Sequence, residues 1–268
     1  MESIPVVFVH GLWIHPTSWQ PWIEYFRDAG YDPTAPAWPG DQATVEQAND
    51  NPNRLAGYGI EDIVEHHKRY IGGLDERPIV IGHSFGGLIA QRLLAEDFAV
   101  AAVAIDPAPI KGVLRVPIST LRVAFPALRN PANRRRPIAL TSEQFRYGFG
   151  NAIPEAESDS LYRRWAIPGP ARPLFEAALA NVTLVSPAKV DTRNSERGPL
   201  LLIGGGRDHT APASITRATY RRYRKSTAVT GILQFPDRGH SLTLDNGWRD
   251  IADAAIHWLA EQPLNRVR

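Results

Sequence analysis

The stretch Pro78–Ala90, which reads PIVIGHSFGGLIA, decides the fold of this chain. Its apolar run Ile79–Ile81 predicts a buried strand. The spacing of the apolar residues from Phe85 to Leu94 predicts a helix with an apolar face. We therefore expect a sharp turn from strand to helix, with Ser84 at its apex.

The glycines at positions 82 and 86 indicate a chemical function for this turn. They frame Ser84 in a G-x-S-x-G pattern, which is typical of a serine nucleophile where it lies between a strand and a helix. We expect a Cβ atom at Gly82 or Gly86 to collide, because the two backbones approach closely there. An ordinary glycine-rich turn is the alternative. The flanking strand, the flanking helix and the doubled Gly86-Gly87 favour the nucleophile.

Outside this stretch, short apolar runs alternate with amphipathic segments. The expected strands are Ile4–Val9, Phe98–Ile105, Leu200–Ile203 and Thr227–Phe235. The expected helices are Pro16–Gly30, Ile60–Tyr70, Ala213–Tyr223 and Trp248–Ala260, and Asp41–Gly57 is expected to be a polar loop. This alternation predicts an α/β fold with a mainly parallel sheet that is flanked by helices on both faces.

A segment of different character separates the two halves of this pattern. From Ala108 to Arg197 the chain mixes prolines, arginines and aromatic residues, and we expect no long strand there. Helical patches are expected near Thr141–Phe149, Glu155–Trp165 and Pro173–Ala180. We therefore predict a core of residues 1–107 and 198–268 with an inserted, mostly helical cap (lid) of residues 108–197.

Reactive side chains follow several of the expected strands. Ser84, Asp208 and His240 each come directly after a strand, and the carboxyl ends of parallel strands meet at one edge of a sheet. A serine hydroxyl needs a base, and the base needs a group that fixes its tautomer. We predict Ser84 as nucleophile, His240 as base and Asp208 as the orienting carboxylate. Their order along the chain is the one expected after this type of turn.

Some site assignments leave alternatives open. Asp106 also ends a strand and rivals Asp208; the glycine-rich turn before Asp208 favours the latter. We predict that the backbone N–H groups of Leu12 and Phe85 form an oxyanion hole. His10 is expected to brace the loop that carries Leu12.

The predicted substrate pocket is apolar and involves aromatic side chains. Its candidate residues are Trp13, His15, His83 and His209. Packing or hydrogen bonding is the plainer interpretation of His83. The run Arg134–Arg136 is most simply a solvated surface, with an anionic partner as the alternative.

Composition excludes several classes of protein. The chain has 268 residues, no cysteine and a formal net charge of +2. Disulfides and thiolate chemistry are therefore excluded, and nothing in the overall charge points to a nucleic-acid or acidic-lipid partner. The N-terminus lacks a basic segment typical of signal peptides, and no apolar run reaches the roughly 18 residues of a membrane span. We expect a cytoplasmic monomer or homodimer, with no metal.

Taken together, the motifs resemble those of the α/β-hydrolase superfamily. They are His10-Gly11, Gly82–Gly87, Gly205–Asp208 and Gly239-His240, in the family's order. The early His10-Gly11 is similar to the compact branch of plant methylesterases and hydroxynitrile lyases. The resemblance implies a cap before the acid-bearing strand and a Ser-His-Asp mechanism without a cofactor. A serine at position 84 argues against haloalkane dehalogenases and epoxide hydrolases, which carry aspartate there.

We therefore expect a serine esterase that cleaves small to medium carboxylic esters through an acyl-enzyme. The same triad could instead serve C–C bond hydrolysis, hydroxynitrile cleavage, lactone hydrolysis, perhydrolysis or acyl transfer. A third possibility is a relative that binds a ligand without catalysis, which predicts a disrupted triad.

Overall fold

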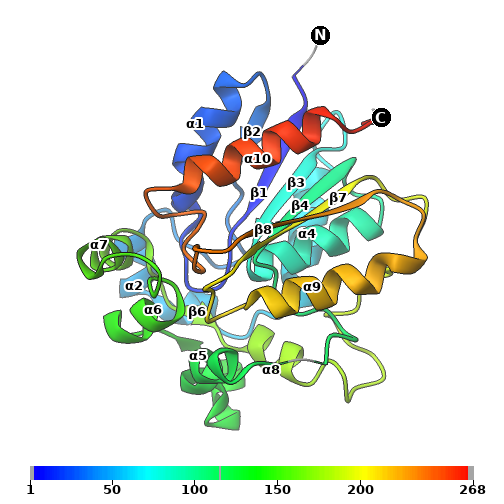
Figure 1. Cartoon of the computed structure of the whole chain (residues 1–268). Helices are drawn as coiled ribbons and strands as arrows, with labels where there is room; N and C mark the ends of the chain where they lie inside the picture. The colour runs from blue at the N-terminus through cyan, green and yellow to red at the C-terminus, as the bar shows by residue number, and fades with distance from the viewer. Residues whose placement is uncertain (1–2, 115, 265–268) are drawn as a thin grey trace.

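A six-stranded parallel sheet forms the centre of the molecule in the computed structural model, which describes residues 3–114 and 116–264 (Figure 1). The strand order is β2-β1-β3-β4-β7-β8, and every neighbouring pair is parallel. The strands are β1 (Pro5–Val9), β2 (Asp32–Thr34), β3 (Ile79–His83), β4 (Ala101–Ile105), β7 (Leu200–Gly205) and β8 (Thr230–Phe235). The predicted α/β class and parallel sheet are confirmed.

Helices cover both faces of this sheet, and β1 shows why. Its side chains alternate between the faces, as a strand buried on both sides requires. Val6 and Phe8 belong to the apolar cluster that includes residues of α1 (Gln20–Asp28) and α10 (Trp248–Ala260). Val7 and Val9 belong to the cluster on the opposite face. Helices α3 (Ile60–Ile71), α4 (Phe85–Ala95) and α9 (Ala213–Arg222) pack on that second side.

The surface segments connect these layers, and one of them differs from the sequence prediction. The predicted polar loop 41–57 contains helix α2 (Val45–Asp50) and a 3-10 turn at Pro52–Leu55. Thr44 caps α2, because its Oγ1 accepts the backbone N–H of Gln47. Ala48 and Leu55 are buried with Ile167 of the inserted segment, so tertiary packing stabilises a helix that the polar composition concealed.

The expected strand Phe98–Ile105 is also shorter than predicted. It begins at Ala101, because the chain turns at Asp97, whose φ is 63°. A 3-10 turn at Pro16–Trp19 precedes α1 and another at Tyr223–Lys225 follows α9. The other core elements begin and end within about three residues of their expected positions.

Between β4 and β7 the chain forms the inserted segment at the lower end of the molecule in Figure 1. Its helices are α5 (Ile118–Leu128), α6 (Ser142–Gly148), α7 (Glu155–Trp165) and α8 (Arg172–Ala178), with a 3-10 turn at Pro131–Arg135. Two-residue strands β5 (Pro137–Ile138) and β6 (Gly169–Pro170) pair antiparallel. The three predicted helical patches are confirmed, whereas α5 was not predicted.

The inserted segment is attached to the loop that follows β1. The indole N–H of Trp13 donates to the carbonyl of Ile138 (2.9 Å), and the backbone N–H of Ile167 donates to the carbonyl of Trp13 (3.0 Å). The backbone N–H of His15 donates to the carbonyl of Trp165 (2.9 Å). These bonds hold the inserted segment over the carboxyl edge of the sheet.

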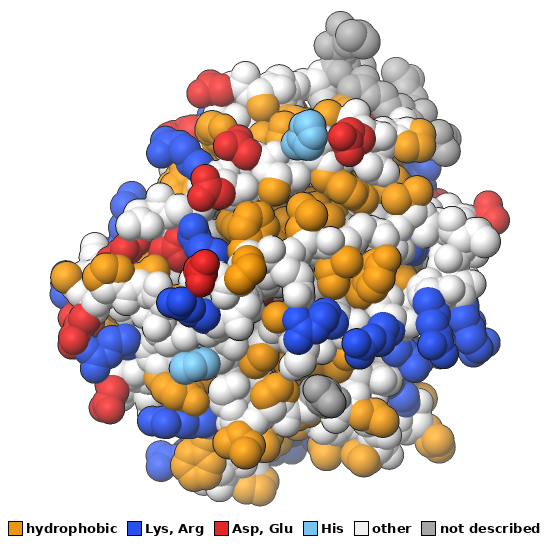
Figure 2. All heavy atoms as spheres, in the orientation of Figure 1, with side chains coloured by type: hydrophobic (Ala, Val, Ile, Leu, Met, Phe, Trp, Pro, Cys, Tyr) orange, Lys and Arg blue, Asp and Glu red, His pale blue; other side chains and the backbone are white. Residues whose placement is uncertain are grey.

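The surface of the inserted segment is unusually apolar. Figure 2 shows hydrophobic side chains gathered at the lower end of the molecule, where Figure 1 places α5 and α8. A row of Lys and Arg side chains crosses the molecule just above them, at the level of α9. None of the described helices is both long enough and apolar enough to cross a membrane.

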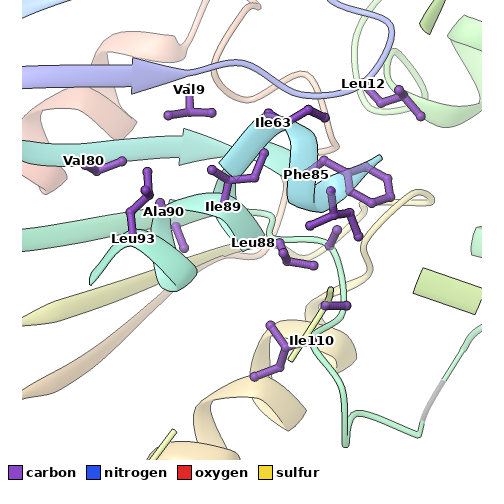
Figure 3. Packing of buried hydrophobic residues seen from close by; sticks show 14 of the residues in the cluster. Val9, Leu12, Ile63, Val80, Phe85, Leu88, Ile89, Ala90, Leu93 and Ile110 are labelled. Atoms are coloured by element: carbon purple, nitrogen blue, oxygen red, sulfur yellow. The ribbon is translucent and has the colours of Figure 1, made fainter. Parts of the chain in front are cut away.

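Helix α4 follows Ser84 and is buried along nearly its whole length, so it is apolar on most sides. Figure 3 shows Leu88, Ile89 and Leu93 of this helix packed beside Val9 and Val80 of the sheet. The base of the turn that carries Ser84 therefore rests on the centre of the core.

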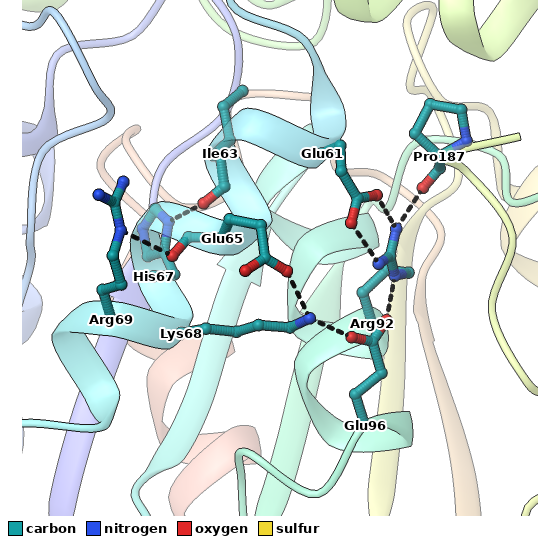
Figure 4. Close-up of polar contacts among 9 residues, drawn as sticks. All are labelled: Glu61, Ile63, Glu65, His67, Lys68, Arg69, Arg92, Glu96 and Pro187. Atoms are coloured by element: carbon teal, nitrogen blue, oxygen red, sulfur yellow. Dashed lines mark hydrogen bonds and ion pairs between the residues drawn. The ribbon is translucent and has the colours of Figure 1, made fainter.

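A polar network fixes α4 against α3 at the edge of this core (Figure 4). The guanidinium of Arg92 contacts the carboxylates of Glu61 (2.9 Å) and Glu96 (2.5 Å) and donates to the carbonyl of Pro187 (2.7 Å). Lys68 bridges Glu65 (2.6 Å) and Glu96 (2.5 Å). The network thus joins both helices to the end of the inserted segment.

Candidate active site

Ser84 lies between β3 and α4 in a backbone conformation that side chains rarely adopt. Its φ is 56° and its ψ is −119°, which are strained values for any residue with a Cβ. Two neighbouring elements hold it there. Its N–H donates to the carbonyl of Ile105 (2.9 Å), and its carbonyl accepts the N–H of Ala108 (2.9 Å). The hydroxyl is thereby fixed at the carboxyl edge of the sheet.

There is no room for a Cβ atom at Gly82 or Gly86, as we predicted from the sequence. A Cβ at Gly82 would lie 2.0 Å from the carbonyl oxygen of Gly86, and a Cβ at Gly86 would lie 2.0 Å from that of Val9. A third glycine was not predicted to act in this way. A Cβ at Gly11 would lie 2.9 Å from Cβ of Ser84, so the loop after β1 passes directly against the serine.

Two further predicted residues meet beside this turn, each from the loop after a neighbouring strand. Nδ1 of His240, after β8, lies 2.6 Å from Oδ2 of Asp208, after β7, and both side chains are fully buried. The other oxygen of Asp208 accepts the backbone N–H groups of Thr210 (2.6 Å) and Ala211 (2.9 Å). These donors aim the carboxylate at the imidazole and stabilise its charge.

Asp106, the rival acid, lies near the same imidazole at a longer distance. Its Oδ2 is 3.8 Å from Nδ1 of His240, and its Oδ1 accepts the backbone N–H of Gly205 (2.6 Å). Burial, reinforced by the negative charge of Asp208, raises the pKa of Asp106 well above its usual range. The geometry favours Asp208 as the partner of the imidazole.

The second nitrogen of His240 is available for a proton. Nε2 is buried and has no hydrogen-bond partner among the described residues. The ring packs beside those of His83 and Phe149, at centroid distances of 4.5 Å and 4.8 Å. Catalytic hydrogen bonds are often long before substrate binds, and an unpaired nitrogen is what a base awaiting the proton of Ser84 requires.

Two backbone N–H groups belong to residues next to Ser84 and to the loop that contacts it. Phe85 is the first residue of α4, and Leu12 follows the glycine that contacts Ser84. Neither N–H donates to another group within the described part of the chain. Figure 3 shows both side chains beyond the carboxyl end of β1. An anion formed beside Ser84 could accept both bonds and would also meet the positive end of the α4 dipole.

A small cavity opens onto Ser84. Its volume is about 90 Å³, and none of the described residues in its wall is charged. Leu12, Trp13 and Phe85 form its inner part. Helices α5 and α8, with neighbouring positions, close its outer part through Val116, Thr120, Leu121, Val123, Ala124, Leu128, Leu174, Ala177 and Ala178. This wall suits an uncharged, apolar group.

Most of these outer residues were missed by the sequence analysis. The signal was present in α5, where Val123, Ala124 and Ala127 are buried on one face. Pro126 within the helix obscured the pattern. A wider groove of about 840 Å³ lies between α5 and α6, but none of the predicted site residues lines it.

Of the four predicted pocket residues, only Trp13 lines the cavity. Nε2–H of His83 donates to the carbonyl of His240 (2.9 Å), and burial lowers the pKa of His83 well below its usual range. His15 contacts Oγ1 of Thr17 (2.7 Å), and His209 contacts the carbonyl of Tyr147 (2.9 Å). These three histidines hold backbone and loops in place outside the cavity wall.

His10 lies where a brace for the Leu12 loop is needed. Its Nδ1 is 3.0 Å from the carbonyl of Gly11, and its Nε2 is 3.0 Å from a carboxylate oxygen of Asp41. Its ring also lies 4.7 Å from that of Trp38. The loop that carries Leu12 is therefore held from behind by a buried side chain.

Two histidines and one aspartate beside Ser84 form a cluster that resembles a metal site. Potential ligand atoms of His83, Asp106 and His240 lie within 4.8 Å of one another. However, Nδ1 of His240 is already bonded to Asp208, and Nε2 of His83 to a backbone carbonyl. The donor set is therefore better explained by hydrogen bonding around one imidazole.

Comparison with protein families gives a match over almost the whole chain. A family model described as "Alpha/beta hydrolase family" matches residues 6–254. No curated protein matches the chain by sequence.

Solved structures resemble this one in fold. A monoacylglycerol lipase from Paleococcus ferrophilus is 22% identical with a TM-score of 0.67, covering 95% of this chain and 93% of its own. The methylesterase MES16 from Arabidopsis is 13% identical with a TM-score of 0.67, covering 96% and 99%. A mutant of polyneuridine aldehyde esterase is 16% identical with a TM-score of 0.68, covering 97% and 100%.

Proposed function

Because the chain belongs to the alpha/beta hydrolase family, we propose that it is a serine esterase for small to medium carboxylic esters. One observation carries this proposal. The buried contact of 2.6 Å between His240 and Asp208 leaves the other imidazole nitrogen unpaired, at the edge of the sheet where Ser84 is held. The solved structures of similar fold include two esterases and a lipase, in keeping with this chemistry.

In the proposed reaction, Oγ of Ser84 attacks the ester carbonyl while Nε2 of His240 accepts its proton. The carbonyl π electrons move to oxygen, and the N–H groups of Leu12 and Phe85 stabilise the oxyanion. When the oxyanion collapses, the C–O bond to the alcohol breaks and His240 returns the proton to the alcohol.

A water molecule then repeats the sequence on the acyl-enzyme. His240 takes a proton from the water, the new C–O bond forms, and the acid leaves as Ser84 recovers its proton. Asp208 stabilises the imidazolium that appears in both halves. No cofactor takes part in these steps.

The preferred acyl group follows from the cavity. The described residues of its wall are uncharged and mostly apolar, which favours an uncharged, apolar group. A volume of about 90 Å³ accommodates only a short chain unless α5 or α8 moves. We infer that residues 108–197 act as a cap, because α5 and α8 form the outer wall while the core provides Ser84.

The test combines covalent labelling with turnover. We expect the wild type to be labelled on Ser84 by a fluorophosphonate and to hydrolyse short-chain aryl esters. Ser84→Ala should lose the label, and its turnover should fall by at least about 10³-fold. Ser160→Ala, on the exposed side of α7, is the matched control and should retain both.

Labelling of the Ser84→Ala variant, or ester turnover equal to that of the wild type, would refute the proposal. A wild type that labels on Ser84 but cleaves no ester would indicate that the serine is reactive toward another class of substrate. Panels of diketones and cyanohydrins would then identify that class.

A further inference from the structure

Large hydrophobic side chains are exposed on one part of the surface. Among the described residues, nine of the twelve large hydrophobic side chains that are exposed lie in segments 114–125 and 179–185. These nine, which we call the apolar face, are Leu114, Val116, Ile118, Leu121, Phe125, Leu179, Val182, Leu184 and Val185. Ile118 is 85% exposed and Leu184 is 98% exposed, so neither packs against the molecule. Contiguous exposed apolar surface of this kind marks an interaction site.

Hydrogen bonds join residues 111–113, directly before the first segment, to the second segment. The backbone N–H of Gly112 donates to Oδ1 of Asn181 (2.6 Å), and Nδ2 of Asn181 donates to the carbonyl of Val113 (2.9 Å). The ammonium of Lys111 donates to the carbonyls of Thr183 and Leu184. The second segment is thus held beside the residues that lead into the first.

Most of the charges around this face are positive. From residue 107 to residue 142 the sequence has seven Lys or Arg residues and no Asp or Glu. From residue 209 to residue 236, which includes α9, it has five Arg or Lys residues and again no acid. Arg222 of α9 lies against Gly112, so the second basic segment adjoins the first. The net charge of +2 conceals this local excess, which Glu143 and Glu155 reduce only where they line a groove with Phe125.

Figure 2 shows the spatial result: an apolar lower end with a row of cationic side chains above it. Three arginines that follow the first segment of the apolar face are also free to meet an external anion. Arg129, Arg134 and Arg135 are exposed and form no ion pair with any acid in the described part of the chain.

Two residues of the apolar face also line the cavity that reaches Ser84. Val116 is 44% exposed and Leu121 is 50% exposed, and both line the cavity wall. An apolar molecule held against this face could therefore reach Ser84 along apolar side chains.

We propose that the apolar face and its basic surround dock on an anionic lipid surface, with the exposed side chains among the acyl chains and the cations at the headgroups. This distribution is the one that holds a protein at a membrane interface, where apolar burial and attraction to anionic lipid add together. The cavity then opens toward the lipid.

A second copy of the chain is a less suitable occupant. Two such faces in contact would bring both basic surrounds together, and their like charges oppose association. An anionic surface neutralises the same charges. Self-association is therefore the competing outcome that the test must detect.

The experiment measures sedimentation of the full chain with vesicles of phosphatidylcholine alone and of phosphatidylcholine mixed with phosphatidylglycerol. We expect binding to the anionic vesicles to be at least about tenfold tighter, and to weaken as salt is added. Binding should fall by at least about tenfold in Ile118→Ser/Leu184→Ser and in Arg129→Glu/Arg134→Glu.

Matched controls lie on other surfaces. Val229→Ser precedes β8, and Arg27→Glu lies on α1 at the opposite end of the molecule, so both should bind like the wild type. Ser84→Ala should also bind normally, which separates this proposal from the proposed chemistry.

Equal binding to both vesicle types, no binding to either, or unchanged binding in both double variants would overturn the proposal. So would a wild-type dimer in solution that Ile118→Ser/Leu184→Ser converts to monomer without changing vesicle binding. Each replaced side chain except that of Ser84 is exposed, and Ser84→Ala removes only a hydroxyl, so unfolding is not expected; circular dichroism checks this.

Discussion

Oδ2 of Asp106 lies 3.8 Å from Nδ1 of His240 and has no hydrogen-bond partner among the described residues. Asp208 reaches the same nitrogen at 2.6 Å. Burial and the charge of Asp208 raise the pKa of Asp106, which favours its protonated form. The imidazole therefore has one carboxylate as a hydrogen-bond partner and a second, more readily protonated carboxyl behind it.

The two acids should differ sharply when each is replaced by asparagine. Asp208→Asn removes the group that fixes the imidazole tautomer, and kcat should fall by about 10³–10⁴-fold. Asp106→Asn preserves shape and replaces a group that is already prone to be neutral, so the loss should stay below about tenfold. Steady-state kinetics on an aryl ester measure both. Equal losses would show that the acid role is shared.

Asp106 should also make stability depend on pH. The pKa of Asp106 is raised in the folded state. Its carboxyl therefore keeps a proton there that it releases above about pH 4 in the unfolded state. Stability should therefore fall as pH rises from about 4 through the raised pKa, at up to about 1.4 kcal/mol per pH unit. In Asp106→Asn this contribution should be absent. Urea unfolding of both proteins across this range tests it, and parallel curves would contradict the assignment.

Gly11 should matter for activity rather than for folding alone. The added methyl group of Gly11→Ala would lie 2.9 Å from Cβ of Ser84, which must displace either the serine or the Leu12 loop. We expect kcat/KM to fall by about tenfold or more, because small displacements of reacting groups are costly. Gly73→Ala is the control, since its Cβ would meet nothing closer than 3.4 Å. Full activity of Gly11→Ala would mean that the loop adapts freely.

His67 should make the protein sensitive to acid. It is fully buried, Nδ1 lies 2.8 Å from the carbonyl of Ile63 (Figure 4), and burial lowers its pKa to about 3. Below pH 6.5, the ordinary pKa of histidine, His67 binds a proton in the unfolded chain but stays neutral in the folded chain. The free energy of unfolding therefore falls as pH falls. Between pH 6.5 and 5 this contribution amounts to about 2 kcal/mol. His67→Gln should lose correspondingly less stability over that interval in urea unfolding, and an equal loss would exclude His67 as the source.

The size of the cavity should set the acyl-chain preference. Ala177 lines its outer wall, and Ala177→Leu would reduce a volume of only about 90 Å³. We expect KM to rise for butyrate and longer aryl esters and to change little for acetate, since only longer chains reach this wall. Ser160→Ala again serves as the control. A uniform change across the ester series would show that Ala177 does not contact the acyl group.

Much of the core could be predicted because its signals are local. The apolar run before Gly82 and the apolar face after Ser84 specify the strand, the turn and the helix within one short stretch, and the structure has all three. Asp208 and His240 could be selected because parallel strands place their carboxyl ends together. The catalytic roles of these residues stay predictions, although the structure brings them into contact.

The outer half of the site could not be predicted, because it depends on packing between distant segments. Helix α5 contains Pro126, and its buried face is recognisable only against α8. The three histidines expected in the pocket lie near Ser84 in sequence or near a strand end, but each is held by a backbone carbonyl or a hydroxyl elsewhere. Nearness to a motif did not indicate the direction of a side chain.

The positive φ of Ser84 has a consequence for how this protein varies over evolution. Glycine adopts that backbone angle without strain, so Ser84→Gly should raise the melting temperature while it removes the hydroxyl. Selection for thermal robustness alone would favour the glycine. A serine at this strained position is therefore what selection for a hydroxyl would leave, against the preference of the backbone.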